Sequence, residues 1–347
     1  MTSDVRAARI VKVVVWDLDN TVWDGTLLED GDVPLRPGIR ETIVELDRRG
    51  ILNSVASRNE HDLAFRRLTE LGMAEYFLHP QINWNAKSAS VQAVVEALDL
   101  GVDTVCFIDD EPYERAEVAH ALPQVLCVDT RELAGLLDRP ELTPEIVTVE
   151  SGERRAMYQA AARRERIEAD FAGPREDFLA DLAMRFEIAA AGTDDLDRAV
   201  ELTVRTNQLN TTGLTYDKAD LAKFRDSDRH LLLVARLTDR FGPYGTIGLT
   251  LLEKGPEVWT IKLLLMSCRV ISRGVGTILL NHLKRAARDA GAVLEAEFRP
   301  TDRNRMMLVS FRFNGFQETG RDGDLVRFTA DLAAIPADPP FVEVARS

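Results

Sequence analysis

Two aspartates stand two residues apart directly after an apolar run near the start of the chain. The run is 11–16, and it is followed by Asp17, Asp19 and Thr21. A carboxylate at such a place can attack phosphorus, and a second one two residues on can give or take the proton of the leaving group. Two like charges this close need a cation, and Mg²⁺ prefers oxygen ligands. The spacing therefore predicts magnesium-dependent phosphoryl chemistry.

Further polar residues at suitable places extend this candidate site. Ser57 would hydrogen-bond phosphoryl oxygens, and Lys87 would supply positive charge. Asp109 and Asp110 would complete the metal site. The bound metal ion would help to neutralise the charge of a transferring phosphoryl group. The alternative for Asp17 is an ordinary turn or cap carboxylate. Four such polar elements appear in order after the predicted strands, and this favours a site over a turn or cap.

The segments that must position these residues alternate between strand-like and helix-like patterns. Strands are predicted over 11–16, 51–56, 104–108 and 125–128, and helices over 36–50, 61–72, 88–100 and 115–122. This alternation predicts an α/β fold with a doubly wound parallel sheet and helices on both faces. Ligands of such sheets bind beyond the carboxyl ends of the strands, which is where Asp17, Ser57 and Asp109 stand.

The second half of the chain has a different organisation. Proline and acidic residues near 138–144 indicate a boundary, and the helical patterns of 150–171 and 175–184 follow it. Later strands are predicted from 187 and over 231–237, 245–253, 257–265 and 293–298, with helices over 196–208, 274–290 and 304–314 and a hairpin within 316–328. The predicted domains are 1–140, a helical linker segment 141–185, and 186–340.

A cysteine and a glycine-containing turn are the candidate reactive features of this half. Cys268 ends an apolar run beside Arg269, where a thiol can have a lowered pKa and act as a nucleophile. A buried structural cysteine is the alternative, and these residues alone favour it. The turn of Arg273, Gly274 and Gly276 would offer backbone N–H groups to a pyrophosphate or a phosphopantetheine, unless it is an ordinary strand-to-helix turn.

Composition and charge exclude several classes of function. The 347 residues carry a net charge of −14 and three cysteines. Residues 1–147 hold 14 basic and 27 acidic residues, and residues 148–347 hold 29 and 30. We expect no nucleic-acid partner, because that needs a dense basic surface. No apolar run reaches the roughly 18 residues of a membrane span. The few cysteines indicate a reducing, cytoplasmic location.

Together these motifs identify a family resemblance over residues 12 to about 316. The first half resembles the haloacid dehalogenase (HAD) superfamily without a large cap, and the second half resembles the GNAT acyltransferase fold, although Ile271 breaks the usual GNAT glycine motif. The whole is similar to the FkbH-like glyceryltransferase/phosphatases of polyketide pathways, closest to members that supply methoxymalonyl-type extender units. The segments that carry the resemblance are 15–23, 82–88, 107–112, 206–212, 239–242, 266–270 and 300–304.

The resemblance implies a set of reactions, whose order the sequence does not fix. Asp17 is the nucleophile and Asp19 the acid/base of a phosphatase, and Mg²⁺ is held by Asp17, the backbone of Asp19 and Asp109. Cys268 attacks the acyl phosphate of 1,3-bisphospho-D-glycerate and becomes a glyceryl thioester. The HAD-like site removes the remaining phosphate. The glyceryl group then passes to the phosphopantetheine thiol of an acyl carrier protein.

Several polar residues are candidates for the acyl site, with capping and turn formation as the alternative. These are Asn207, Gln208, Asn210, Thr211, Arg269, Thr301 and Asn304. Three basic stretches, 154–155, 163–166 and 284–285, are candidates for docking an acidic carrier, with solvated helix faces as the alternative. Asp239 and Arg240 are interpreted as site residues or as a surface ion pair.

Two other functions compete with this interpretation. One is a Mg²⁺-dependent phosphatase fused to an acetyl-CoA-dependent N-acetyltransferase, and the broken glycine motif disfavours it. The other is a scaffold that docks a carrier protein with inert sites, and the complete set Asp17, Asp19, Lys87 and Asp109 disfavours it.

Overall fold

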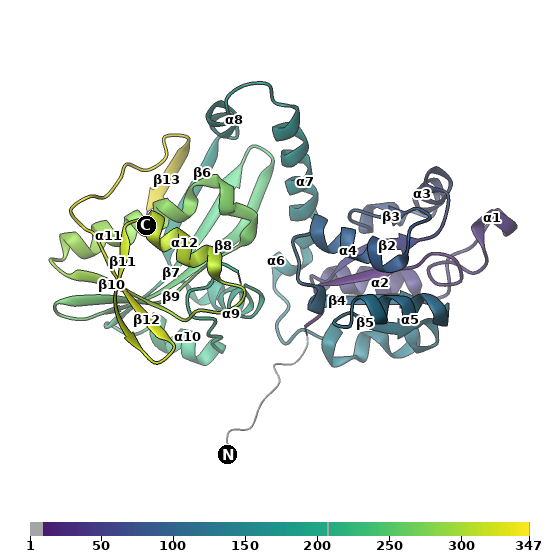
Figure 1. Cartoon of the computed structure of the whole chain (residues 1–347), viewed down its shortest axis with the longest axis horizontal. Helices are drawn as coiled ribbons and strands as arrows, with labels where there is room; N and C mark the ends of the chain where they lie inside the picture. The colour runs from purple at the N-terminus through teal and green to yellow at the C-terminus, as the bar shows by residue number, and fades with distance from the viewer. Residues whose placement is uncertain (1–9, 207, 347) are drawn as a thin grey trace, which may run out of the picture. The chain divides into compact units, whose positions relative to one another are not determined.

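The computed structural model describes residues 10–206 and 208–346, apart from the side chain of Cys268. The chain divides into two compact units, Met1–Gln159 and Ala160–Ser347 (Figure 1). The division falls inside helix α7, Arg154–Asp170. No helix of the described residues has the length and apolar character to cross a membrane.

Unit 1 is built on a parallel sheet of five strands in the order β3-β2-β1-β4-β5. In chain order its elements are β1 Val13–Trp16, α1 Leu27–Asp30, α2 Ile39–Arg48, β2 Leu52–Ser57, α3 His61–Glu70, β3 Gln81–Ile82, α4 Lys87–Ala97, β4 Val105–Asp109, α5 Pro112–Ala121, β5 Leu126–Asp129 and α6 Val149–Gly152. The sequence predicted helices α2, α3, α4 and α5 and all strands except the two-residue β3, with ends shifted by up to three residues, but it did not anticipate α1.

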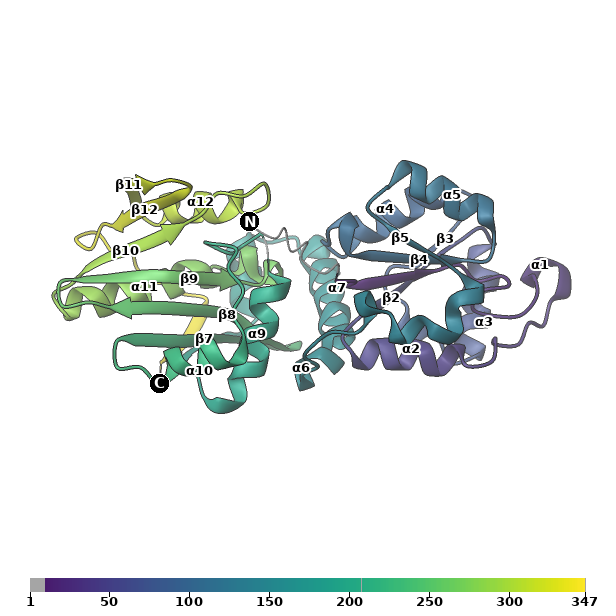
Figure 2. The ribbon, with the colours of Figure 1, turned by 90° about the horizontal axis from the view of Figure 1, so that it is seen from below.

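The alternation of side chains along β1 creates two cores in unit 1. Val14 and Trp16 join a cluster with α2 and α3, whereas Val13 and Val15 join a second cluster with α4 and α5. Helices therefore cover both faces of the sheet, as Figure 2 shows. This confirms the predicted α/β fold with a doubly wound parallel sheet.

Unit 2 contains an eight-stranded mixed sheet in the order β11-β12-β10-β9-β8-β7-β6-β13. Its further elements are α8 Arg175–Asp181, β6 Met184–Ala190, α9 Leu196–Arg205, α10 Lys218–Arg225, β7 His230–Asp239, β8 Gly242–Lys254, β9 Val258–Met266, α11 Val275–Asp289, β10 Val293–Phe298, α12 Arg305–Phe313, β11 Phe316–Asp322, β12 Leu325–Ala330 and β13 Val342–Arg346. The sequence analysis did not anticipate α10 or β13, and β13 lies beyond the predicted limit of residue 340.

Two neighbouring strands of this sheet, β9 and β10, separate part of the way along their length. β9 and β10 pair in parallel over 258–261 and 293–296, and β9 then continues to Met266 beside β8 but no longer beside β10. The separation leaves a gap between the ends of β9 and β10. Cys268 follows the end of β9 at Met266 by two residues.

Candidate functional site

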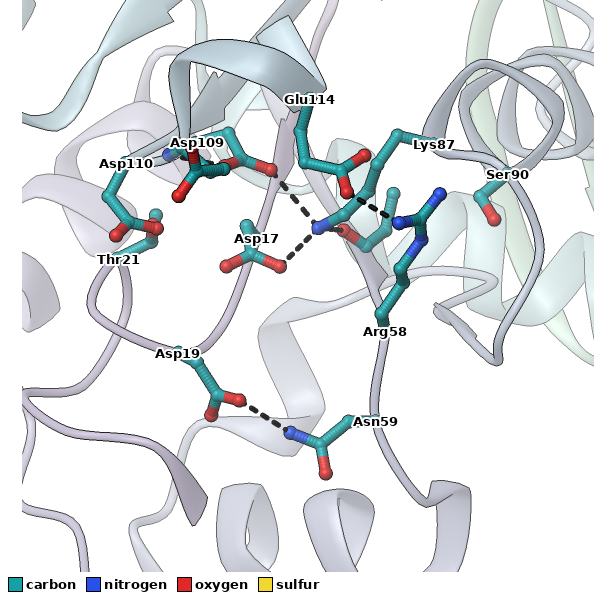
Figure 3. A network of polar contacts seen from close by, with 12 residues as sticks. Asp17, Asp19, Thr21, Arg58, Asn59, Lys87, Ser90, Asp109, Asp110 and Glu114 are labelled. Carbon is teal, nitrogen blue, oxygen red and sulfur yellow. Dashed lines mark hydrogen bonds and ion pairs between the residues drawn. The ribbon is translucent and has the colours of Figure 1, made fainter. Parts of the chain in front are cut away.

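The carboxyl ends of three adjacent strands bring the candidate phosphatase residues of unit 1 together. β1 lies between β2 and β4, so Asp17, Ser57 and Asp109 stand at one edge of the sheet. Figure 3 shows Asp17 beside Asp109 and Asp110. Ligand oxygens of Asp17, Asp109 and Asp110 lie within 4.8 Å of one another. The predicted convergence of these residues is therefore observed.

Lys87, the first residue of α4, lies buried among these carboxylates. Its Nζ forms an ion pair with Asp17, lies 3.1 Å from Asp109 Oδ2 and donates a hydrogen bond of 2.8 Å to the carbonyl oxygen of Ala56. One ammonium pairs with two of the three clustered carboxylates, and this leaves negative charge that a divalent cation would balance. Mg²⁺ suits such a set of oxygen donors.

The protonation behaviour of the cluster reflects this crowding. Burial raises the pKa of Asp17 to about 6, against the opposing effect of Lys87 and with a further rise from Asp109. Burial likewise raises the pKa of Asp109 and of Asp110. A divalent cation acts in the opposite direction, because it favours the ionised carboxylates. The residues present thus fit a magnesium ion.

Two hydroxyl groups border the cluster. Thr21 is fully buried, and its Oγ1 donates to Asp110 Oδ1 over 3.5 Å. Ser57 is 3% exposed, and its Oγ has no hydrogen-bond partner among the described residues. An unsatisfied buried hydroxyl costs free energy unless a ligand pairs with it. Ser57 is thus placed to bind an anionic oxygen.

Asp19 is held apart from the other carboxylates. Its Oδ1 accepts from Trp23 Nε1 at 2.7 Å and from the backbone N–H of Leu27 at 3.1 Å, and its Oδ2 accepts from Asn59 Nδ2 at 3.1 Å (Figure 3). Sequence reasoning missed Asn59 as a site residue. The signal available was its position two residues after Ser57, at the same strand end.

The candidate residues of unit 2 are only partly described. Cys268 begins a short 3₁₀ segment, Cys268–Arg273, and its side chain lies outside the described residues, as does all of Asn207. Gln208 lies in the loop between α9 and α10. Arg269 donates to Ser267 Oγ and to the carbonyl oxygen of Tyr244, each over 3.2 Å. The roles predicted for these residues stay predictions.

The chain itself occupies the place where β9 and β10 separate. Leu209 accepts a backbone hydrogen bond of 2.9 Å from Met266, and Thr211 donates one of 3.0 Å to Leu264. On the other side, Arg299 after β10 donates to the carbonyl oxygen of Thr211 over 2.9 Å. The segment 209–211 therefore joins the end of β9 to the end of β10.

The predicted acyl-site side chains stabilise this segment. Thr211 Oγ1 accepts from the N–H of Leu264 at 3.0 Å, and Asn210 Oδ1 accepts from the N–H of residues 212 and 213. Asn304 Nδ2 donates to the carbonyl oxygen of Asn210 at 3.0 Å, and its Oδ1 accepts from the N–H of Thr301 at 2.8 Å. These contacts are the capping and turn contacts of the alternative interpretation, and an acyl-site role stays a prediction.

The glycine turn before α11 is covered by the end of the chain. Arg273 is buried and pairs with Glu168 over 3.1 Å. Gly274 adopts a φ of 76°, and a Cβ there would lie 3.1 Å from Pro339 Cγ. A Cβ on Gly276 would lie 3.5 Å from Met266 Sδ. The turn is packed against protein, and phosphopantetheine binding at these residues stays a prediction.

Several residues of the three basic stretches make contacts within the protein, and docking by these stretches stays a prediction. Arg155 pairs with Asp47 over 3.1 Å, and Arg285 pairs with Asp338 over 2.8 Å. Arg164 is 2% exposed and makes two hydrogen bonds, of 2.6 and 2.8 Å, to Asp239. Lys284 is buried. The interpretation of Asp239 as part of a surface ion pair is therefore wrong, because α7 buries it.

Comparisons with known proteins found structural similarity over parts of the chain. No family model and no curated protein matches the chain. A crystal structure of the N-terminal part of BF1531 from Bacteroides fragilis, which contains a phosphatase domain complexed with Mg, is 25% identical over 40% of this chain, with a TM-score of 0.36. This chain spans 42% of the length of that structure.

Other similar structures are acetyltransferases. The ribosomal-protein-S18-alanine N-acetyltransferase from Escherichia coli is 17% identical over 42% of this chain and 92% of its own, with a TM-score of 0.34. The GNAT domain of S. lividans PAT is 19% identical over 42% and 89%, also with a TM-score of 0.34. Because these TM-scores lie below 0.5, the functional argument rests on the residues of the chain itself.

Proposed function

We propose that the chain is a bifunctional glyceryltransferase/phosphatase that loads a glyceryl group onto an acyl carrier protein. The observation that carries the phosphatase half is the buried convergence of Asp17, Asp109 and Asp110 around Lys87, beside the unpaired hydroxyl of Ser57. The transferase half is supported by the family resemblance of the segments around Asn210, Cys268 and Asn304.

In the phosphatase step, a carboxylate oxygen of Asp17 attacks phosphorus and the bond to the leaving hydroxyl oxygen breaks. Asp19 gives that oxygen its proton. A water molecule then attacks the aspartyl phosphate and gives a proton to Asp19, which frees inorganic phosphate and restores Asp17. Lys87 and Ser57 bind the phosphoryl oxygens. A magnesium ion held by Asp17, Asp109 and Asp110 would neutralise their charge.

In the transfer step, the Cys268 thiolate attacks the carbonyl carbon of the acyl phosphate and inorganic phosphate leaves. The phosphopantetheine thiol of the carrier then loses its proton to solvent or to the released phosphate and attacks the resulting thioester. The bond to Cys268 breaks and Cys268 leaves as its thiolate. An acyl phosphate is already activated, so the step needs a thiolate and hydrogen-bond donors to the carbonyl oxygen more than a strong base. No histidine partner is required.

Acetyl-CoA-dependent transfer receives less support. The turn that would hold a pyrophosphate packs against Pro339, and Arg273 beside it is paired with Glu168. An inert scaffold also receives less support. Burying Lys87 beside clustered carboxylates costs free energy, and a scaffold without chemistry has no use for such a cluster.

Intact-protein mass spectrometry tests the proposal. The enzyme is incubated with Mg²⁺, freshly generated 1,3-bisphosphoglycerate and a phosphopantetheinylated carrier protein. We expect a glyceryl or phosphoglyceryl adduct on Cys268 that passes to the carrier, none with Cys268→Ala, and none with 3-phosphoglycerate, which lacks the acyl phosphate. Loading of the carrier by Cys268→Ala at the wild-type rate, or loading from acetyl-CoA instead, overturns the proposal.

A further inference from the structure

Helix α12 presents an apolar stripe to solvent. Met306, Val309 and Phe313 are 48%, 54% and 84% exposed, and their spacing places them on one side of the helix. Met307 and Phe311 on the other side are buried in the core of unit 2. Single exposed apolar residues are ordinary, but a stripe with the i, i+3, i+7 spacing is typical of a helix that packs against a partner.

Two arginines border this stripe. At 100° per residue, Arg305 and Arg312 lie next to each other along one edge of the apolar stripe. Neither arginine forms an ion pair within the described part of the chain. They differ in this from Arg155, Arg164 and Arg285, which are all paired with carboxylates. The stripe and its two arginines, which we call the α12 face, combine apolar area with available positive charge.

The α12 face begins beside the segment that joins β9 and β10. Asn304 immediately precedes α12, and its Nδ2 donates to the carbonyl oxygen of Asn210. Asn210 in turn forms a β-bridge with Leu265, three residues before Cys268. A partner seated on α12 would thus lie at the end of unit 2 that carries the proposed nucleophile. Figure 2 shows α12 at the margin of unit 2, beside β11 and β12.

We propose that the α12 face is the docking site for the carrier protein, and that it binds an acidic, amphipathic helix of that partner. This inference rests on the proposed transferase function. Phe313 supplies the largest apolar contact, and such exposed aromatic residues commonly dominate interface energies. Arg305 and Arg312 pair with carboxylates along the partner helix, which sets its orientation and speeds association.

Carrier-dependent kinetics of surface variants test this docking site. Phe313→Glu and the pair Arg305→Glu with Arg312→Glu should each raise the carrier concentration needed for half-maximal loading roughly 10- to 30-fold. The rate of Cys268 acylation by 1,3-bisphosphoglycerate without carrier should stay at the wild-type value. Matched controls are Val149→Glu, as exposed as Phe313 but in unit 1, and Arg321→Glu on β11, and both should load normally.

A charge exchange separates docking from a structural effect. A carrier in which the acidic residues of the helix after the pantetheine serine are changed to lysine should load poorly with wild-type enzyme. It should recover with the Arg305→Glu, Arg312→Glu enzyme. If wild-type enzyme loads the carrier and the α12 variants load it as the controls do, the docking site is wrong and the transferase function stands. If wild-type enzyme acylates neither Cys268 nor carrier, the proposed function itself fails, and the docking inference falls with it.

Discussion

Each unit of this protein buries a lysine, and the two lysines have opposite surroundings. Lys87 in unit 1 is 3% exposed and faces Asp17 and Asp109, which outweigh the effect of burial and raise its pKa. Lys284 in unit 2 is 1% exposed, donates to the carbonyl oxygen of Asn314 and packs over the ring of Phe316, and burial lowers its pKa. A buried charge therefore does not by itself indicate a site.

The same contrast holds for uncharged polar groups. Ser57 in unit 1 leaves a buried hydroxyl without a partner beside the carboxylates, whereas Asn304 in unit 2 uses both ends of its amide to hold neighbouring backbone. An unpaired buried hydroxyl that stands beside a charged cluster points to a ligand, and groups that are fully satisfied point to stability. Four comparisons of variants test this distinction.

The largest expected effect is that of Lys87→Met. Three crowded carboxylates lose their only described ammonium partner, so the free energy of unfolding of the cation-free protein should fall by about 3–5 kcal/mol. Phosphatase activity should be lost. Lys284→Met should cost only about 1 kcal/mol, because no carboxylate is left uncompensated. Chemical denaturation measures both. Lowering the pH to 5 should restore stability to the first variant only, and equal losses at both pH values would contradict the distinction.

Asn304→Ala should destabilise unit 2 by about 2–3 kcal/mol, since it leaves two backbone carbonyl oxygens and one N–H without their partner. Thr212→Val is the matched control. The Oγ1 of Thr212 is buried with no hydrogen-bond partner in the described residues, so its removal should change stability by less than about 0.5 kcal/mol. Thermal unfolding compares the two. A larger loss for Thr212→Val would show that its hydroxyl has a partner after all.

Ser57→Ala should lower the phosphatase activity without lowering the stability of the fold. We expect a roughly 10- to 100-fold fall in kcat/KM for a small phosphate ester, because one donor to the phosphoryl oxygens is gone. The free energy of unfolding should not fall, since the hydroxyl has no partner in the described structure to lose. Unchanged kinetics with lowered stability would assign Ser57 a structural role.

The smallest expected effect is a pH dependence. The pKa of Asp17 in the folded chain is raised from 3.8 to about 6, so between these values the folded state holds a proton that the unfolded state has lost. The stability of the cation-free protein should therefore fall as pH rises from about 4 to about 6, by an amount on the order of 1–3 kcal/mol. Asp17→Asn should remove this part of the profile, and Mg²⁺ should flatten it. A profile that is the same for wild type and Asp17→Asn would contradict the raised pKa.

The sequence predicts unit 1 well because its signals are local. Each parallel strand is a short apolar run, and the polar residue that ends it must lie at the common edge of the sheet, so Asp17, Ser57 and Asp109 are placed without knowledge of tertiary contacts. Asn59 was missed because its role depends on which way the side chain of Asp19 turns. Neither spacing nor residue type specifies that direction.

The sequence predicts unit 2 less well because its decisive contacts are non-local. Arg164 lies in a charge run that is typical of a solvated helix, and only the fold brings Asp239 to it. β13 is a short segment after a proline-rich stretch, and it pairs in parallel with β6, more than 150 positions earlier in the chain. Strand pairing at such a separation has no local signature. For the same reason, the filling of the gap between β9 and β10 by residues 209–211 was not anticipated.

The most direct test of the phosphatase site is magnesium-dependent hydrolysis of p-nitrophenyl phosphate by wild type, Asp17→Asn and Cys268→Ala. All chemistry of this step is assigned to residues of unit 1. We therefore predict that wild type and Cys268→Ala release phosphate at the same rate with Mg²⁺, that both stop when the ion is chelated, and that Asp17→Asn is inactive by a factor of roughly a thousand or more. Hydrolysis by Asp17→Asn at the wild-type rate, or its loss in Cys268→Ala, would contradict the account.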